Sequence, residues 1–166
     1  MNLTEYYYLA SDKQLPIGSF GSSSYIRGMD WKDEYGAGIF VEKEESVSKH
    51  FSLPYQVSIR AELGSFQPDD YSNISTVDYK CLETLFNYIH NVASAYKECQ
   101  FQLLSSINSK ENEPVKNHKK ILLKQLKSPT QLILENQELL DIKKQNTFQR
   151  KRNTYYQKKT GLDFVQ

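Results

Sequence analysis

The sequence predicts an α+β fold: a mostly antiparallel sheet, one main amphipathic helix at residues 80–98 packed on it, and a short second helix at residues 117–127. Residues 55–63 alternate between apolar and polar side chains, which is typical of a strand with one face in water. Residues 80–98 repeat apolar side chains at helical spacing. Strand-like segments precede and follow this helix instead of alternating with helices, and this order favours α+β.

The composition indicates one folded domain. The chain has 166 residues, of which 39% are hydrophobic and 25% charged, as in ordinary globular proteins. No apolar run is long enough for a membrane span, and the first residues lack the pattern of a signal peptide. Two cysteines, Cys81 and Cys99, provide no disulfide framework. We therefore expect a soluble, cytoplasmic protein with reduced thiols and no contact with the membrane.

The first third of the chain predicts two strands separated by a loop. Residues 5–11 form an aromatic strand candidate that ends before Pro16, and residues 36–44 form a second one around a short apolar centre. Between them, the glycines and serines of residues 18–24 predict a loop. Their spacing matches neither a P-loop nor a dinucleotide fingerprint, so no phosphate site is expected.

The main helix should have Asp78 as its N-cap. Its predicted core-facing stripe consists of Leu82, Leu85, Phe86, Ile89, Val92, Ala93 and Tyr96. A strand at residues 99–107 should follow it, and Asn117 would cap the lysine-rich second helix.

Residues 128–142 leave two possibilities open. Ser128, Pro129 and Gln131 have the spacing of a capping box with proline at the first helical position, which predicts a helix start. Two short strands within residues 133–140 are the alternative, and the hairpin they would form is slightly preferred.

Charge is distributed unevenly along the chain. Residues 1–114 carry nine Lys and Arg against sixteen Asp and Glu, a net charge of −7, whereas residues 115–166 carry twelve against four, a net charge of +8. Such segregation bears on association rather than on fold. We expect a single domain over residues 1–146 and a basic C-terminal extension over residues 147–166.

No catalytic, metal or cofactor site is predicted. The histidines, His50, His90 and His118, lack metal-ligand spacing. Cys81 lies near a predicted helix start, where a thiol can become reactive, but a free cysteine at the edge of an apolar stripe is usually a small buried hydrophobe.

The candidate partner-binding residues form an acidic, aromatic cluster: Asp30, Trp31, Asp33, Glu34 and Tyr35. Tryptophan is enriched at protein interfaces, and the carboxylates complement a basic partner. The preferred hypothesis is a protein-interaction protein without catalytic activity that binds another protein through its acidic N-terminal half.

The C-terminal extension combines basic and aromatic residues: Arg150, Arg152, Tyr155, Tyr156, Lys158 and Lys159. Such a segment suits nucleic acid, because it neutralises phosphates and stacks on bases. It also suits docking on the acidic body, in the same chain or in a homo-oligomer. A nucleic-acid-associated protein is thus the second hypothesis, and an enzyme with a site assembled from distant loops is the third.

Several stretches together resemble a loose group of small uncharacterised proteins of Gram-positive bacteria. They are "EYYYLASDKQLPIGSF", "YQVSIRAEL", "CLETLFNYIHNVASAYKE" and "CQFQLLSSI". In that group an aromatic first strand runs into a D-x-P-L type turn, whereas this chain has Asp12-Lys-Gln-Leu-Pro16. The resemblance implies an immunity- or antitoxin-like binding role and no catalytic residues.

Overall fold

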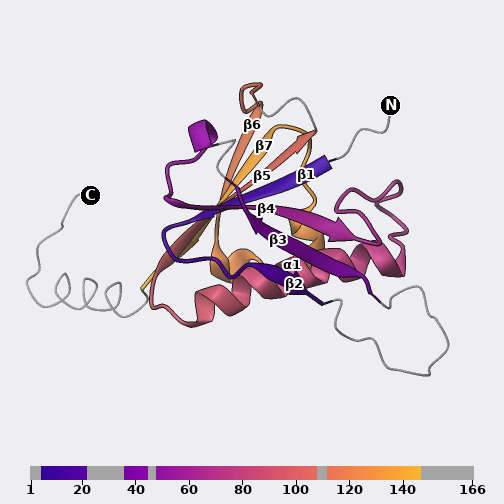
Figure 1. Ribbon diagram of the computed structural model, residues 1–166, viewed down its shortest axis with the longest axis horizontal. Helices are drawn as coiled ribbons and strands as arrows, with labels where there is room; N and C mark the ends of the chain where they lie inside the picture. The colour runs from indigo at the N-terminus through magenta and orange to yellow at the C-terminus, as the bar shows by residue number, and fades with distance from the viewer. Residues whose placement is uncertain (1–4, 22–35, 45–47, 108–111, 147–166) are drawn as a thin grey trace, which may run out of the picture.

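A computed structural model describes residues 5–21, 36–44, 48–107 and 112–146 (Figure 1). Helix α1 (Thr76–Ser94) crosses one face of a seven-stranded sheet, so the described chain has two main layers. The strand order is β2-β3-β4-β1-β5-β7-β6, and every neighbouring pair is antiparallel except β6 and β7. This arrangement confirms the α+β prediction.

The strands have these bounds: β1 (Glu5–Ser11), β2 (Gly18–Phe20), β3 (Gly38–Lys43), β4 (Tyr55–Glu62), β5 (Cys99–Ile107), β6 (Asn117–Leu122) and β7 (Glu138–Lys144). Three short 3-10 turns accompany them: η1 (Ser48–His50), η2 (Leu123–Gln125) and η3 (Pro129–Leu132). The predicted strands at residues 5–11, 36–44, 55–63 and 99–107 are confirmed as β1, β3, β4 and β5. A strand, β2, also begins the segment predicted as a loop, because Gly18–Phe20 pairs with β3.

The main core lies between the sheet and α1. Alternate residues of the central strands, such as Leu9, Ile59 and Leu103, are fully buried in the core cluster that also contains the inner face of the helix. The opposite face of the sheet carries a smaller cluster around Tyr8, Leu104 and Leu139. Both clusters draw on β5, so seven of its nine residues are buried although four of the nine are polar.

The helix begins about one turn earlier than predicted. Ser75, not Asp78, is the N-cap, and its hydroxyl accepts a hydrogen bond from the Asp78 backbone N–H at 3.1 Å. The Asp78 carboxylate instead accepts from the backbone N–H of Ser65 at 2.8 Å. The first turn is partly exposed and lacks an apolar stripe, so periodicity did not reveal it.

The predicted short helix at residues 117–127 is wrong. This segment forms β6 and then η2, because Lys119 and Ile121 pair in parallel with Leu140 and Ile142 of β7. The lysine and leucine pattern resembles an amphipathic helix, but strand pairing with a distant segment prevails over this local preference.

Neither alternative for residues 128–142 is correct as a whole. The predicted helix start forms only the single turn η3, where the Gln131 side chain accepts from the Ser128 backbone N–H at 2.9 Å. The hairpin preference is wrong in its first strand, because the residues between η3 and Glu138 form no strand, and β7 begins at Glu138.

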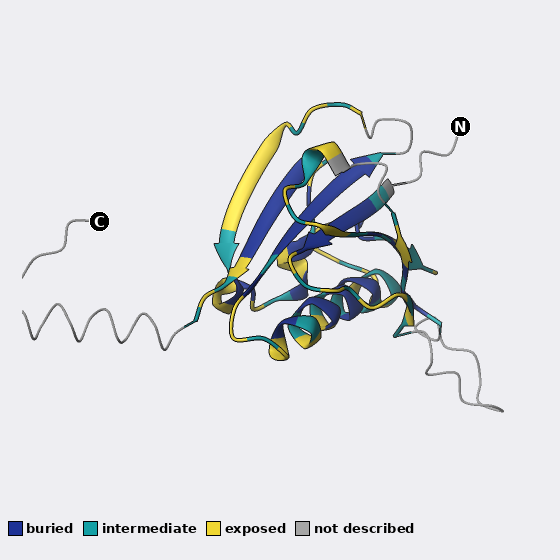
Figure 2. Ribbon diagram, turned by 60° about the vertical axis from the view of Figure 1, so that its left-hand side comes forward, coloured by how far each residue is buried: buried dark blue, intermediate teal, exposed yellow. Residues whose placement is uncertain are grey.

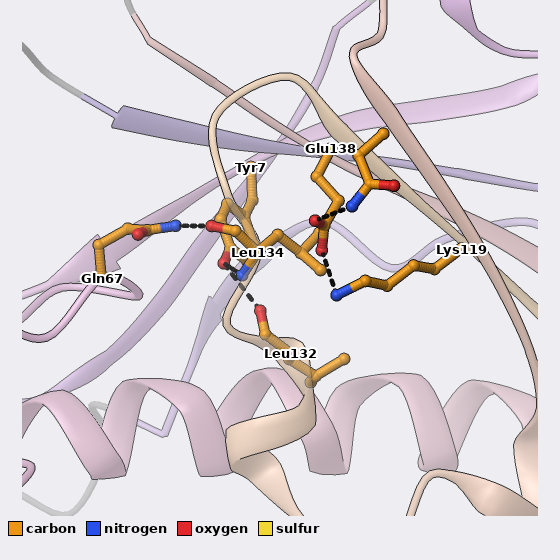
Figure 3. Close-up of polar contacts among 7 residues, drawn as sticks. Tyr7, Gln67, Lys119, Leu132, Leu134 and Glu138 are labelled. Atoms are coloured by element: carbon orange, nitrogen blue, oxygen red, sulfur yellow. Dashed lines mark hydrogen bonds and ion pairs between the residues drawn. The ribbon is translucent and has the colours of Figure 1, made fainter. Parts of the chain in front are cut away.

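Tyr7 fixes the segment between η3 and β7. Its hydroxyl donates to the Leu132 carbonyl at 2.7 Å and accepts from the Leu134 N–H at 2.9 Å (Figure 3). The Gln67 side chain donates to the Leu134 carbonyl, and the Tyr7 ring stacks on Phe66 with centroids 4.6 Å apart. One phenol therefore holds the chain that leads to β7 against the core.

Candidate binding surface at the β6 edge

Strand β6 is an exposed edge of the sheet. Among the described residues no strand pairs with its outer side, and residues 117–120 are exposed (Figure 2). Its neighbour β7 is buried over residues 138–142, so the boundary between solvent and core runs between these two strands. An open edge is a natural place for another chain to dock.

One buried carboxylate of β7 attaches β6 on the helix side. Glu138 is only 1% exposed and shares its side of the strand with the core residues Leu140 and Ile142. It accepts a hydrogen bond from the Asn117 side-chain amide at 2.7 Å and lies 3.2 Å from the Lys119 ammonium (Figure 3). Lys119 therefore neutralises a buried charge and has a structural role.

A second carboxylate attaches β6 on the other side of the sheet. Asp141 is buried on the face that carries Leu139, and the His118 ring nitrogen Nε2 contacts its carboxylate. Gln102 of β5 is the cross-strand neighbour of Asp141. The His118 side chain is 43% exposed, but its ring pairs with a buried acid that lies 23 residues further along the chain.

Four lysines remain on this side of the molecule without an acidic partner in the described chain: Lys120, Lys124, Lys127 and Lys143. All four are exposed, and together they define what we call the β6 edge surface. Lys116 lies close by, but it approaches Glu113 at 3.9 Å. The β6 edge surface thus carries positive charge that the described fold does not use.

A pocket with an apolar floor opens within this surface. Its volume is about 310 Å³, and it is lined by His90, Leu122, Leu123, Lys124, Lys143, Lys144 and Gln145. The lining of this lysine-rimmed pocket comes from α1, from the ends of β6 and β7, and from η2. Apolar pockets with a few polar groups at the rim are the usual form of a binding site.

Two of the polar groups in the lysine-rimmed pocket are already engaged. His90 Nε2 lies 3.0 Å from the Leu126 carbonyl oxygen. The Lys144 ammonium donates to the carbonyls of Ala93 and Tyr96 at 2.9 and 2.7 Å, where it complements the C-terminal end of α1. Lys124 and Lys143 are therefore the cations at the rim that remain available to a ligand.

A second pocket, of about 290 Å³, lies between the N-terminal region and the last turns of α1. Tyr88 lines it and donates its phenolic hydrogen to the Pro16 carbonyl at 2.7 Å. Burial raises the pKa of this phenol far above its ordinary value, so Tyr88 stays protonated at physiological pH. The pocket contains no basic or acidic side chain and offers no obvious chemistry.

The thiols are poor nucleophiles. Cys81 is fully buried and its thiol donates to the Glu62 carbonyl at 3.3 Å, and burial raises the pKa of both Cys81 and Cys99. The prediction that Cys81 is a small buried hydrophobe is confirmed. Neither His50 nor Cys81 lines the two pockets described above.

The predicted site residues lie outside the described residues. This holds for the acidic, aromatic cluster of Asp30, Trp31, Asp33, Glu34 and Tyr35, and for the extension with Arg150, Arg152, Tyr155, Tyr156, Lys158 and Lys159. Both remain predictions. Within the described ranges, no three His, Cys, Asp or Glu side chains are grouped so that they could hold a metal ion. No helix in the described part of the chain is long and apolar enough to cross a membrane.

Comparisons with protein families, with curated proteins and with solved structures find no match for this chain. The resemblance to small Gram-positive proteins therefore stays a prediction. The β6 edge surface was not identified from the sequence, although a signal for it was present: the C-terminal third is strongly basic. What the sequence could not reveal is that Lys124 and Lys143 lie at one pocket with His90 of α1.

Proposed function

We propose that this chain is a small protein-interaction protein and that its β6 edge surface binds an acidic partner protein. One observation carries the proposal: two exposed lysines without acidic partners in the described chain, Lys124 and Lys143, line an apolar pocket at the edge of the sheet. Lysines around such a pocket match a partner segment that has carboxylates next to an apolar side chain. In this proposal the chain acts by binding and not by catalysis.

The chemistry of the surface favours protein over nucleic acid as the partner. Residues 116–146 contain no Phe, Tyr or Trp, so the described edge offers no aromatic platform on which a base could stack. The floor of the lysine-rimmed pocket is leucine, which suits an apolar side chain. Nucleic acid is the second candidate, because the basic, tyrosine-containing extension starts at residue 147, three residues after Lys144 at the end of β7.

Two expectations from the sequence belong to the same proposal. The acidic, aromatic cluster at residues 30–35 would give the protein a second binding surface, of opposite charge. An immunity- or antitoxin-like role in the cytoplasm is one biological form of such binding. The buried, free thiols Cys81 and Cys99 are compatible with a reducing compartment.

Charge reversal at the rim of the pocket tests the proposal. The edge-reversed variant carries Lys124→Glu and Lys143→Glu. The matched control carries Arg60→Glu and Lys80→Glu, which makes the same change in net charge on β4 and the first turns of α1, away from the pocket. Each protein is immobilised at full length, and the proteins that it captures from its own cells are identified and then purified for binding measurements.

We expect at least one directly binding protein that the wild type and the matched control retain and that the edge-reversed variant loses by about tenfold or more. If the edge-reversed variant retains every partner with unchanged affinity, the proposal is wrong. Capture that depends on the lysines but disappears after nuclease treatment would instead support the second candidate, nucleic acid.

A further inference from the structure

We propose that the lysine-rimmed pocket receives the side chain of Trp31 from a second copy of this chain, so that the protein self-associates head to tail. This inference rests on the proposed function, because it names the acidic partner of the β6 edge surface. It identifies that partner as the chain's own cluster at residues 30–35.

The first argument is the size and lining of the pocket. A volume of about 310 Å³ is at the lower end of the range for ligand pockets. It therefore suits one large side chain better than an extended molecule. Leu122 and Leu123 contribute the apolar lining, and Lys124 and Lys143 place two available cations at the rim.

The second argument is the chemistry of residues 30–35. Trp31 is the only tryptophan in the chain, and Asp30, Asp33 and Glu34 lie within three residues of it. A tryptophan on the pocket floor would bring neighbouring carboxylates to the rim, where Lys124 and Lys143 have no partner in the described chain. Tryptophan is also the residue type most often found to dominate binding energy at protein interfaces.

The third argument concerns reach, and it excludes docking within one chain. Gly36, the nearest described residue, is five residues from Trp31, so their Cα atoms are at most about 18 Å apart. From β3 to β6 there are five strand spacings, or about 24 Å. The pocket also lies at the other end of the sheet. Gly38 at the start of β3 pairs with Glu62, at the end of the sheet where β1 begins and β5 finishes. The pocket instead adjoins Lys143 and Lys144, which pair with the first residues of β5. The total separation exceeds about 30 Å.

The resulting contact is heterologous, since the pocket and residues 30–35 are different parts of the chain. Each copy added to an assembly leaves one pocket and one acidic segment open at the two ends. Such association continues into longer assemblies unless a ring closes. We therefore expect an average mass that rises with concentration and does not stop at a dimer.

Sedimentation velocity of the full-length protein, from low to several hundred micromolar, provides the first test. We expect self-association in the wild type and in the matched control. It should weaken by about tenfold or more in Trp31→Ala and in the edge-reversed variant. Circular dichroism and urea unfolding establish that each variant is folded.

A charge-swap experiment separates this contact from a general loss of structure. In a second variant, the segment-reversed variant, Asp33→Lys and Glu34→Lys make the acidic segment basic. Each reversed variant should be monomeric alone, because its pocket and segment then have the same charge. A mixture of the two should associate again, since each pocket meets a segment of opposite charge. Adding Trp31→Ala to both variants should abolish this rescue, because each of the two contacts in the mixture then lacks its tryptophan.

A wild type that remains monomeric at several hundred micromolar overturns the inference, as does a mixture that shows no rescue. Rescue that persists without Trp31 means that net charge, and not pocket insertion, drives association, and it overturns the inference too. These failures are distinct from a failure of the proposed function. If the protein is monomeric but binds a different protein, and charge reversal at Lys124 and Lys143 weakens that binding, the proposed function stands.

Discussion

Removing the hydroxyl of Tyr7 should lower the free energy of unfolding far more than removing the hydroxyl of an exposed tyrosine. Tyr7 is fully buried, and its hydroxyl is both the donor to the Leu132 carbonyl and the acceptor for the Leu134 N–H. In Tyr7→Phe the ring can still stack on Phe66, so packing is largely kept. What disappears is the partner of two backbone groups in residues that are at most 2% exposed.

The expected magnitude follows from those two groups. A buried polar group that loses its hydrogen-bond partner costs about 1–3 kcal/mol, and an N–H is harder to leave unpaired than a carbonyl. We therefore expect Tyr7→Phe to lower the free energy of unfolding by about 2–4 kcal/mol. For a chain of this length, each kcal/mol lowers the melting temperature by about 2–4 °C.

Urea unfolding followed by circular dichroism measures this change, provided that the slope of the transition stays the same. Tyr71→Phe is the matched control, because Tyr71 is 65% exposed and should change stability by less than about 0.5 kcal/mol. If Tyr7→Phe is as stable as Tyr71→Phe, then the phenol does not hold the segment before β7, and the account of that region is wrong.

Three further experiments test local parts of the structure. Lys144→Met should cost about 1–2 kcal/mol and speed amide exchange in the last turn of α1, because the ammonium binds two carbonyls there. Ser75→Ala should cost about 1 kcal/mol in urea unfolding, whereas Ser75→Asp should be nearly neutral, since only the former removes the N-cap acceptor. Ellman's reagent should modify Cys81 slowly in the native protein and readily in urea. Because burial raises the pKa of this thiol, stability should fall as the pH rises above the ordinary thiol value.

The sequence correctly predicts the elements in which the spacing of apolar side chains shows which face of the element is buried. In β4 the alternation of side chains records a wetter and a drier face, and in α1 the stripe from Leu82 to Ala93 records contact with the sheet. In β6 the same reasoning fails: Ile121 pairs with Ile142, and Lys119 neutralises Glu138. Both partners lie about twenty residues further along the chain, and nothing in a local window indicates them.

The candidate surface shows the same limit. Composition reveals that the C-terminal third is basic, but it does not separate lysines that serve the fold from those that remain available. Lys119 and Lys144 look like Lys120 and Lys143 in the sequence. The structure separates them, because Lys119 lies against a buried carboxylate and Lys144 binds the end of α1.

The lysines of β6 have a second physical explanation, which has to be weighed against binding. Charged side chains on an edge strand prevent unwanted pairing with other sheets, and this protection alone would account for Lys120. It does not account for Lys124 and Lys143, since the first lies in η2 and the second in β7, which is covered by strands on both sides. Both lysines line one apolar pocket, which keeps two positive charges close together, and edge protection does not require this arrangement. The two explanations therefore predict different effects of substitution. Lys120→Val should add aggregation without loss of a partner, because it removes the charge from the edge strand, whereas charge reversal at Lys124 and Lys143 should cause loss of a partner without aggregation.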